Sequence, residues 1–146
     1  NRATVLLISV KPLSSPVTYF FTTIGFELGK DSEGNFSEAR SLGMLQKYAS
    51  LMGLDQKTGI EISEASPQVS DKNAVPSYIG QGTNAFTTSQ LARYASTIAT
   101  SGTIYKLSLL DRVTDSKGKL IKEYPSETAG QLDLSSNIWD DIHDGM

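Results

Sequence analysis

YIGQGTNAFTTSQLARYASTIATSG, which occupies residues 78–102, decides the fold of this chain more than any other stretch. Its first part contains the triplet Gly80, Gln81 and Gly82. Glycine adopts backbone conformations that other residues avoid, so two glycines one residue apart permit a sharp bend or a close approach to another group. The triplet therefore predicts a tight turn.

A helix is expected directly after this turn. Thr87 has the side chain of an N-cap, and Gln90 follows three residues later, which is the spacing of a capping box. The apolar residues that come next share one helical face: Leu91, Tyr94, Ala95, Ile98 and Ala99. Gly102 is expected to end the helix. The pattern thus predicts an amphipathic helix over residues 88–101.

Composition limits the classes of function. The 146 residues, 38% of them hydrophobic and 20% charged, are enough for one domain with a core. A net charge of −3 gives no electrostatic footprint for nucleic acid, and the absence of cysteine excludes disulfides and thiolate catalysis. The longest apolar run, Val5–Val10, is too short to span a bilayer. Because the chain has neither an initiator methionine nor a signal peptide, we expect it to be a segment of a longer protein.

Further helices and one β-hairpin complete the predicted elements. The helices are expected at 16–28 with Ser15 and Pro16 at its start, at 37–52 with Gly53 at its end, and after a Ser135 cap. The extended segments are a short strand at Ile60–Ile62 and a hairpin formed by Lys106–Thr114 and Lys119–Tyr124, with a long irregular loop at Ser63–Ser77. Helices with a small antiparallel sheet place the chain in the α+β class.

Three stretches together resemble one protein family. They are YFFTTIGFELG at Tyr19–Gly29, LQKYASLMGLDQKTGIEI at Leu45–Ile62, and the stretch at 78–102. The sequences of these stretches and their order along the chain resemble the penicillin-binding protein transpeptidases that cross-link bacterial peptidoglycan. Among these, the class B enzymes of the elongation type fit best. The resemblance implies a fragment of the penicillin-binding, serine β-lactamase-like fold, in which residues 1–146 form a partial transpeptidase domain between the second and third active-site motifs.

The resemblance also implies the chemistry of the parent protein. Family members use a nucleophilic serine in an S-x-x-K motif, together with S-x-N and K-T-G. Their substrates are peptidoglycan stem peptides, and β-lactams trap the same serine. They need no cofactor, and they are anchored in the bacterial cytoplasmic membrane with the catalytic domain outside it. We expect this chain to lack S-x-x-K and therefore to form no acyl-enzyme by itself.

Two strings in the sequence spell the other motifs in the wrong places. Lys57-Thr58-Gly59 is expected to be a loop tripeptide after a helix, because the family's third motif should follow Met146. Ser135-Ser136-Asn137 spells S-x-N but is expected to open a helix. We therefore assign neither string a catalytic role.

The second motif should lie just before Tyr19, and here the sequence departs from the family. Ser15 and Thr18 are candidate remnants of it, with Thr18 at the place of the family's asparagine; Ser15 is alternatively a helix cap. For the turn of Gly80, Gln81 and Gly82, the resemblance implies a position facing the substrate cleft. The alternative is that Gln81 hydrogen-bonds buried backbone groups.

The sequence also offers one possible metal site and two rival functions. Asp140, Asp141, His143 and Asp144 could form a metal cluster, but a solvated helix face explains them better, so no metal site is predicted. The rivals to a transpeptidase segment are a non-catalytic binding or scaffold module with the same fold and, more distantly, a relative of β-lactamases or carboxypeptidases.

A segment cut from such a domain should expose apolar helix faces. The residues concerned are Phe20, Phe21, Ile24, Leu91 and Ile98. Because burial of apolar surface is favourable, we expect the chain to self-associate through them, with the Val5–Val10 segment adding to a sheet edge.

Overall fold

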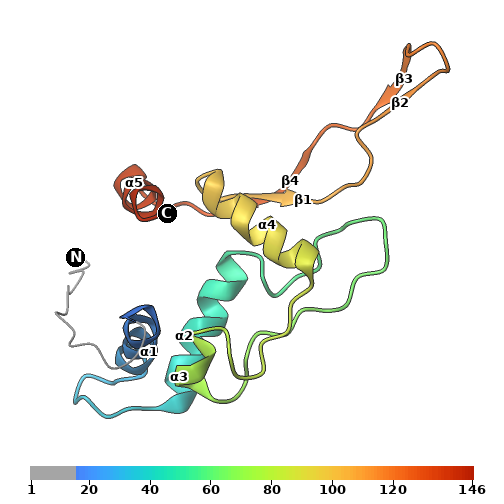
Figure 1. The fold of residues 1–146 in the computed structure, drawn as a ribbon. Coiled ribbons are helices and arrows are strands. Elements are labelled where there is room, and N and C mark those ends of the chain that lie inside the picture. The colour runs from blue at the N-terminus through green and yellow to red at the C-terminus, as the bar shows by residue number, and fades with distance from the viewer. Residues whose placement is uncertain (1–15) are drawn as a thin grey trace.

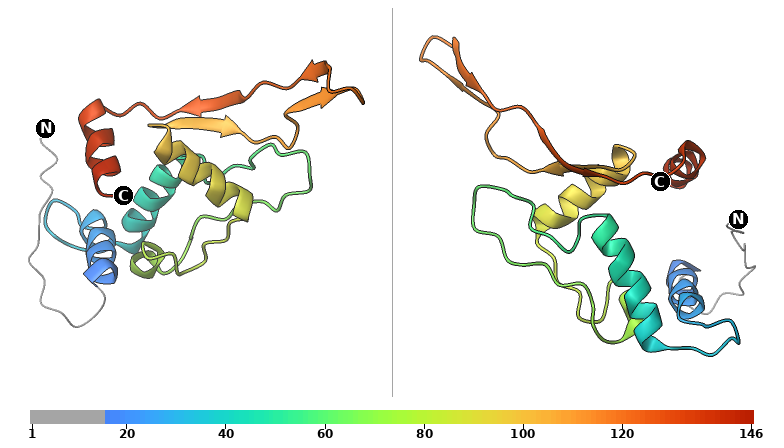
Figure 2. Two further views of the ribbon diagram at one scale, coloured as in Figure 1. Left: turned by 45° about the horizontal axis from the view of Figure 1, so that its top comes forward. Right: turned by 180° about the vertical axis from the view of Figure 1, so that it is seen from behind.

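The computed structural model describes residues 16–146 of the chain. The predictions that concern the Val5–Val10 segment and the Ser15 cap lie outside the described residues. Figures 1 and 2 show the arrangement of the rest: a group of helices from the first part of the chain, a fourth helix beside them, and a long protruding hairpin.

The described residues form five helices and four strands (Figure 1). The helices are α1 (Pro16–Leu28), α2 (Glu38–Leu51), α3 (Ala74–Ser77), α4 (Thr88–Ala99) and α5 (Ser136–Asp144). The strands are β1 (Thr103–Lys106), β2 (Arg112–Thr114), β3 (Leu120–Glu123) and β4 (Glu127–Gln131). Helices with small antiparallel sheets confirm the predicted α+β class.

The helix α4 begins as predicted. The Thr87 hydroxyl accepts a hydrogen bond from Gln90 N, and the Gln90 side chain accepts one from Thr87 N, so both halves of the capping box form. The buried Gln90 amide also donates to Ala65 O at 3.1 Å. The cap therefore fixes the long loop before α3 as well as the helix start.

The end of α4 differs from the prediction. The helix stops at Ala99, and Ser101, with a φ of 51°, is the left-handed residue that ends it. The bond from Gly102 N to Thr97 O, at 2.8 Å, closes a Schellman motif. Gly102 is needed for space, because a Cβ there would lie 2.3 Å from Leu132 O and 2.8 Å from the ring of Trp139, the buried residue of α5.

The hairpin has two parts instead of the single one predicted. Strand β1 pairs with β4, and β2 pairs with β3, both antiparallel. The prediction missed β4 because its sequence, ETAGQ, lacks alternating apolar residues. The predicted strand at Ile60–Ile62 is wrong: this segment has no strand partner, and the Glu61 side chain instead accepts hydrogen bonds from Ser108 and Leu109.

Helices α1, α2 and α3 meet at a polar contact. The buried Ser41 hydroxyl of α2 donates to Gly25 O at 2.7 Å, and the Tyr78 hydroxyl donates to Ser41 O at 2.9 Å. Glycine is required at position 25, since a Cβ there would lie 2.5 Å from the Tyr78 ring. Hydrogen bonds and ring packing therefore hold these three helices together.

Arg93 of α4 joins the two halves of the described structure. Its guanidinium is buried and donates to three main-chain carbonyls after the end of α2: Gly53, Gln56 and Lys57. Burial lowers the pKa of Arg93, while nearby Glu64 and Asp55 act in the opposite direction. A buried cation is tolerated here because three carbonyl oxygens accept hydrogen bonds from its N–H groups and the acidic Glu64 and Asp55 lie nearby.

Large apolar residues remain exposed on the helices, as the sequence predicted for Phe20, Phe21 and Leu91. In α1, Phe20 and Phe21 are 50% and 42% exposed, and Leu91 of α4 is 49% exposed. Ile24 and Ile98 are only partly exposed. The side chains that are buried in residues 16–146 include more polar ones than apolar ones, so hydrogen bonding carries much of the cohesion.

Replacement of Arg93 tests whether it holds α4 to the loop after α2. Arg93→Met should lower the free energy of unfolding by about 3 kcal/mol, because the loop carbonyls lose their buried partner. Arg93→Lys should restore part of this, since a lysine keeps the charge but lacks the planar fork. Denaturant unfolding measures both. The exposed Arg40→Met is the matched control, with an expected change within about 0.5 kcal/mol; equal effects at the two arginines would contradict the assignment.

Candidate functional site

The turn of Gly80, Gln81 and Gly82 has the backbone that the sequence predicted. Gly80 and Gly82 have φ angles of 78° and 75°, in the left-handed region that favours glycine. Gly82 is also confined by its neighbours, because a Cβ would lie 2.3 Å from Ser77 Oγ and 2.9 Å from Ser70 Oγ. A substitution at Gly82 would therefore be strained both in its backbone and in its packing.

The side chain of Asn84 holds this turn against the preceding loop. Its Oδ1 accepts from Ser70 N at 2.8 Å, and its Nδ2 donates to Ser77 O at 3.2 Å and Gln81 O at 3.1 Å. The hydroxyl of the fully buried Ser70 accepts from Thr83 N at 3.0 Å. These bonds fix the main chain on both sides of Gln81.

The Gln81 side chain is exposed. Within residues 16–146 it makes no hydrogen bond, so the role of satisfying buried backbone groups belongs to Asn84 and Ser70. Sequence reasoning missed both residues. Their only signal was a set of small polar residues around the turn, and such residues are common in any loop.

At the edge of the turn, Asp71 and Thr83 form a reciprocal pair. Thr83 Oγ1 donates to Asp71 Oδ1 at 2.7 Å and accepts from Asp71 N at 3.1 Å. The hydrogen bond from Thr83 is the main cause that lowers the pKa of Asp71. The carboxylate is exposed, so it remains available on the surface beside the turn.

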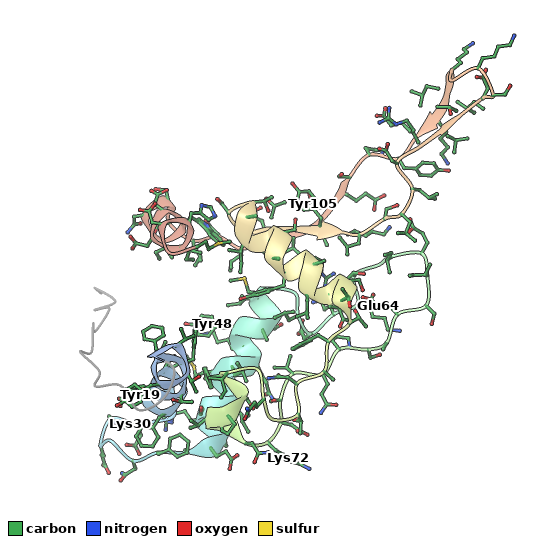
Figure 3. All side chains as sticks on the ribbon, in the orientation of Figure 1. Tyr19, Lys30, Tyr48, Glu64, Lys72 and Tyr105 are labelled. Atoms are coloured by element: carbon green, nitrogen blue, oxygen red, sulfur yellow. The ribbon has the colours of Figure 1, made fainter. Side chains whose placement is uncertain are left out.

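Glu64 is a hydrogen-bond centre at the start of α4, where Figure 3 labels it. Its carboxylate accepts from Thr58 N at 2.7 Å, Ser89 Oγ at 2.7 Å and Thr87 Oγ1 at 3.1 Å. Burial acts to raise the pKa of Glu64, but the hydrogen bonds from Ser89, Thr58 and Thr87 outweigh it and hold the pKa below the ordinary 4.5. This one carboxylate thus joins two parts of the loop after α2, at positions 58 and 64, to the N-terminus of α4.

The loop that contains Lys57, Thr58 and Gly59 is anchored at each residue. The carbonyl of Lys57 accepts from Arg93 at 2.9 Å, and the buried Thr58 binds Glu64. Gly59 has a φ of 82°, and a Cβ there would lie 2.9 Å from the Lys106 stem. The Lys57 side chain itself is exposed. The triplet is a loop, as predicted.

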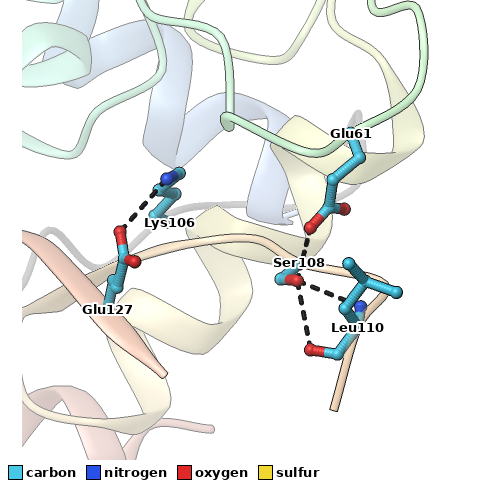
Figure 4. Close-up of polar contacts among 5 residues, drawn as sticks. All are labelled: Glu61, Lys106, Ser108, Leu110 and Glu127. Atoms are coloured by element: carbon cyan, nitrogen blue, oxygen red, sulfur yellow. Dashed lines mark hydrogen bonds and ion pairs between the residues drawn. The ribbon is translucent and has the colours of Figure 1, made fainter. Parts of the chain in front are cut away.

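A hollow of about 540 Å³ lies where the two parts of the hairpin separate. Its walls come from residues 107–111, from 124–126 and from Glu61 of the loop after α2. Figure 4 shows the contacts at its edge: Glu61 accepts from Ser108 Oγ at 2.5 Å, and Lys106 pairs with Glu127 at 3.1 Å. No sequence pattern predicted this hollow, because it exists only where the strand pairing is interrupted.

The penicillin binding protein transpeptidase domain model matches residues 13–146 of the chain. The chain belongs to this family. Among solved structures it is similar to penicillin-binding protein 2B of Streptococcus pneumoniae, from strain 5204 with a TM-score of 0.69 and from strain R6 with 0.68, each at 20% identity. Both matches cover 88% of this chain, but only 24% and 23% of those chains.

At that identity the likeness to penicillin-binding protein 2B shows the fold alone. The chain spans about a quarter of the length of the solved structures that it resembles. No curated protein sequence gives a significant match. Within residues 16–146, no helix has both the length and the apolar character needed to cross a membrane.

The expectation that the sequence of this transpeptidase segment contains no S-x-x-K was wrong. Ser116-Lys117-Gly118-Lys119 spells the motif. These residues lie in the exposed turn between β2 and β3, where Asp115 Oδ1 accepts from Lys117 N and Lys119 N, each at 2.9 Å. A catalytic S-x-x-K needs both side chains on one helix face, so this turn does not supply it.

The remaining residues that the sequence analysis singled out as site candidates do not come together in one site. Thr18 lies in the first turn of α1, where its carbonyl accepts from Thr22 Oγ1 at 2.9 Å; Ser15 lies outside the described residues. Ser135 stands at the N-cap position of α5, although its side chain makes no capping bond. In the part of the chain that the structure describes, no group of three acidic or histidine side chains is placed to hold a metal ion, the residues Asp140, Asp141, His143 and Asp144 included.

Glu64 should make the stability of the segment depend on acid. Its pKa is lowered in the folded state, so its contribution is present above the ordinary value of 4.5 and is lost as the pH falls through the folded pKa. Glu64→Gln should cost about 1–2 kcal/mol at pH 7. The difference from the unmodified chain should shrink below pH 4.5.

Thermal or denaturant unfolding between about pH 3 and pH 7 measures the difference in free energy of unfolding between Glu64→Gln and the unmodified chain. The exposed Glu33→Gln is the matched control and should leave the pH profile unchanged. A Glu64→Gln profile that runs parallel to the unmodified one over the whole range would show that Glu64 does not titrate as assigned.

Proposed function

We propose that this chain is the part of a peptidoglycan D,D-transpeptidase domain that lies between the second and third active-site motifs. The observation that carries the proposal is the family match over residues 13–146, together with the common fold. The parent protein is proposed to be a class B enzyme of the elongation type. It would be anchored in the cytoplasmic membrane and would act outside it.

In the parent, a serine from another part of the polypeptide would attack the stem peptide and transfer the acyl group to a neighbouring amine. β-Lactams would acylate the same serine. The turn of Gly80, Gln81 and Gly82 would contribute to the substrate cleft, and its support by Asn84 and Ser70 favours this role because exposed binding residues need a fixed main chain. Residues 1–146 would then be a partial domain.

The isolated chain is proposed to be inactive. The only S-x-x-K string lies in a hairpin turn, and K-T-G lies in an anchored loop. One observation favours the second candidate, a non-catalytic scaffold module: Thr18 stands where the family's second motif has asparagine. The presence or absence of the nucleophile motif elsewhere in the complete protein distinguishes the two.

Labelling with a fluorescent penicillin tests the proposal. The isolated chain should form no heat-stable adduct, because it offers no activated serine. The complete polypeptide should be labelled on a serine outside residues 1–146, and excess unlabelled penicillin should prevent this. Peptide mapping by mass spectrometry locates the adduct.

Two results would count against the proposal. An adduct on Ser116 that Ser116→Ala abolishes would show that Ser116, in the hairpin turn, is the nucleophile. A complete polypeptide that is folded and remains unlabelled would favour the scaffold module.

Self-association is the second prediction of the partial-domain proposal. The exposed side chains of α1, with Phe20 and Phe21 among them, should meet a second copy because burial of apolar surface gains roughly 25 cal/mol per Å². Sedimentation should show dimers or larger species that dissociate in Phe20→Ser/Phe21→Ser. The doubly substituted Lys117→Ser/Lys119→Ser in the hairpin turn is the control. A compact monomer at high concentration would show that the segment is a self-sufficient domain.

A further inference from the structure

The hollow at the neck of the hairpin is formed by two stretches that are not joined as strands. Strand β1 ends at Lys106 and β2 begins at Arg112, while β3 ends at Glu123 and β4 begins at Glu127. Between these strands the two arms of the hairpin diverge, as Figure 1 shows, and the hydrogen bond from Tyr124 N to Asp111 O joins them again. We call the hollow of about 540 Å³ that the residues of this region line the neck hollow.

The walls of the neck hollow combine apolar surface with carboxylates. Leu109 and Leu110 line it and are 63% and 47% exposed, with the rings of Tyr105 and Tyr124 and with Pro125 beside them. Exposed leucines in a concave surface are a common feature of protein and peptide binding sites. The apolar part of the lining therefore favours an apolar group in the occupant.

The charges of the lining are unbalanced. Four carboxylates line the neck hollow, those of Glu61, Asp111, Glu123 and Glu127, against one cation, Lys106. Lys106 pairs with Glu127, and Asp111 pairs with Arg112. Even with Arg112 and with Lys122, whose ammonium lies over the Tyr124 ring, the acids outnumber the bases.

Two of these carboxylates make no ion pair within residues 16–146, although Lys106 helps to lower the pKa of Glu61 and Arg112 stands opposite Glu123 in the pairing of β2 with β3. Glu61 accepts hydrogen bonds from uncharged donors, Ser108 Oγ at 2.5 Å and Leu109 N at 2.9 Å, which leave its charge in place. The hydrogen bond from Ser108 is the main cause that lowers the pKa of Glu61, so the group is ionised at neutral pH. The Glu123 side chain has no hydrogen bond or ion pair among the described residues.

We propose that the neck hollow docks an extended peptide segment in which lysine or arginine side chains alternate with apolar ones. The cationic groups would meet Glu61 and Glu123, and the apolar side chains would cover Leu109 and Leu110. In an extended segment, alternate side chains point to opposite sides, so one segment presents both kinds of group along a narrow space. None of the residues that line the neck hollow belongs to the Gly80–Gly82 turn.

Titration with the hexapeptide acetyl-Lys-Leu-Lys-Leu-Lys-Leu-amide tests the proposal on the 146-residue chain. Chemical shifts of the neck residues should move, with a dissociation constant below about 1 mM. Glu123→Gln should weaken binding about three- to fivefold, as for an exposed ion pair, and Leu110→Ser about tenfold. Higher salt should weaken binding to the unmodified chain more than binding to Glu123→Gln.

Matched controls separate this site from general attraction between a basic peptide and an acidic chain. Asp140→Asn, on the exposed face of α5, removes the same charge and should leave the dissociation constant unchanged. The peptide acetyl-Glu-Leu-Glu-Leu-Glu-Leu-amide should not bind. Equal weakening by Asp140→Asn and Glu123→Gln, equal binding of the two peptides, shift changes confined to other regions, or no binding up to about 1 mM would each overturn the proposal.

Discussion

The buried guanidinium of Arg93 is the interaction on which the rest of this structure depends. It donates to the carbonyls of Gly53, Gln56 and Lys57, which follow the end of α2, and so it ties α4 to the first half of the chain. These carbonyls can converge on one side chain because Gly53 adopts a φ of 72° and turns the main chain out of the helix. A lysine could not replace this fork, since its single ammonium lacks the planar set of donors.

Polar contacts take the place of a large apolar core in this segment. Glu64 connects the Thr58 loop to the start of α4, while Ser41 connects α1 and α2. Buried polar groups stabilise a structure only when their partners are present, and within residues 16–146 every buried side-chain oxygen and nitrogen has one. Because polar contacts provide the cohesion, the phenylalanines of α1 stay exposed and leave apolar surface available for a partner or for further chain.

The turn of Gly80, Gln81 and Gly82 and the neck hollow show two ways in which a fold creates a surface for binding. The turn is fixed by hydrogen bonds from Asn84 and Ser70, so its exposed glutamine sits on a constrained main chain. The neck hollow lies at an interruption of the strand pairing, where Ser108 Oγ and Leu109 N donate to the Glu61 carboxylate and the neighbouring residues pair with no strand. The surface at the turn depends on side-chain hydrogen bonds, whereas the neck hollow depends on the absence of strand pairing at that point of the hairpin.

Local features were determined by the sequence alone: the capping box of Thr87 and Gln90, the helix end at Gly53, the turn at Gly80–Gly82 and the family. Each depends on residues close together in the chain, where side-chain chemistry and backbone preference act directly. Only the tertiary structure decided that Ile60–Ile62 is no strand, that ETAGQ is one, and that the Gln81 side chain is exposed while Asn84 holds the main chain of the turn. The long-range bonds behind these outcomes join residues 14 to 48 positions apart, such as Ser70 with Asn84 and Glu61 with Leu109, and no local pattern encodes such a pairing.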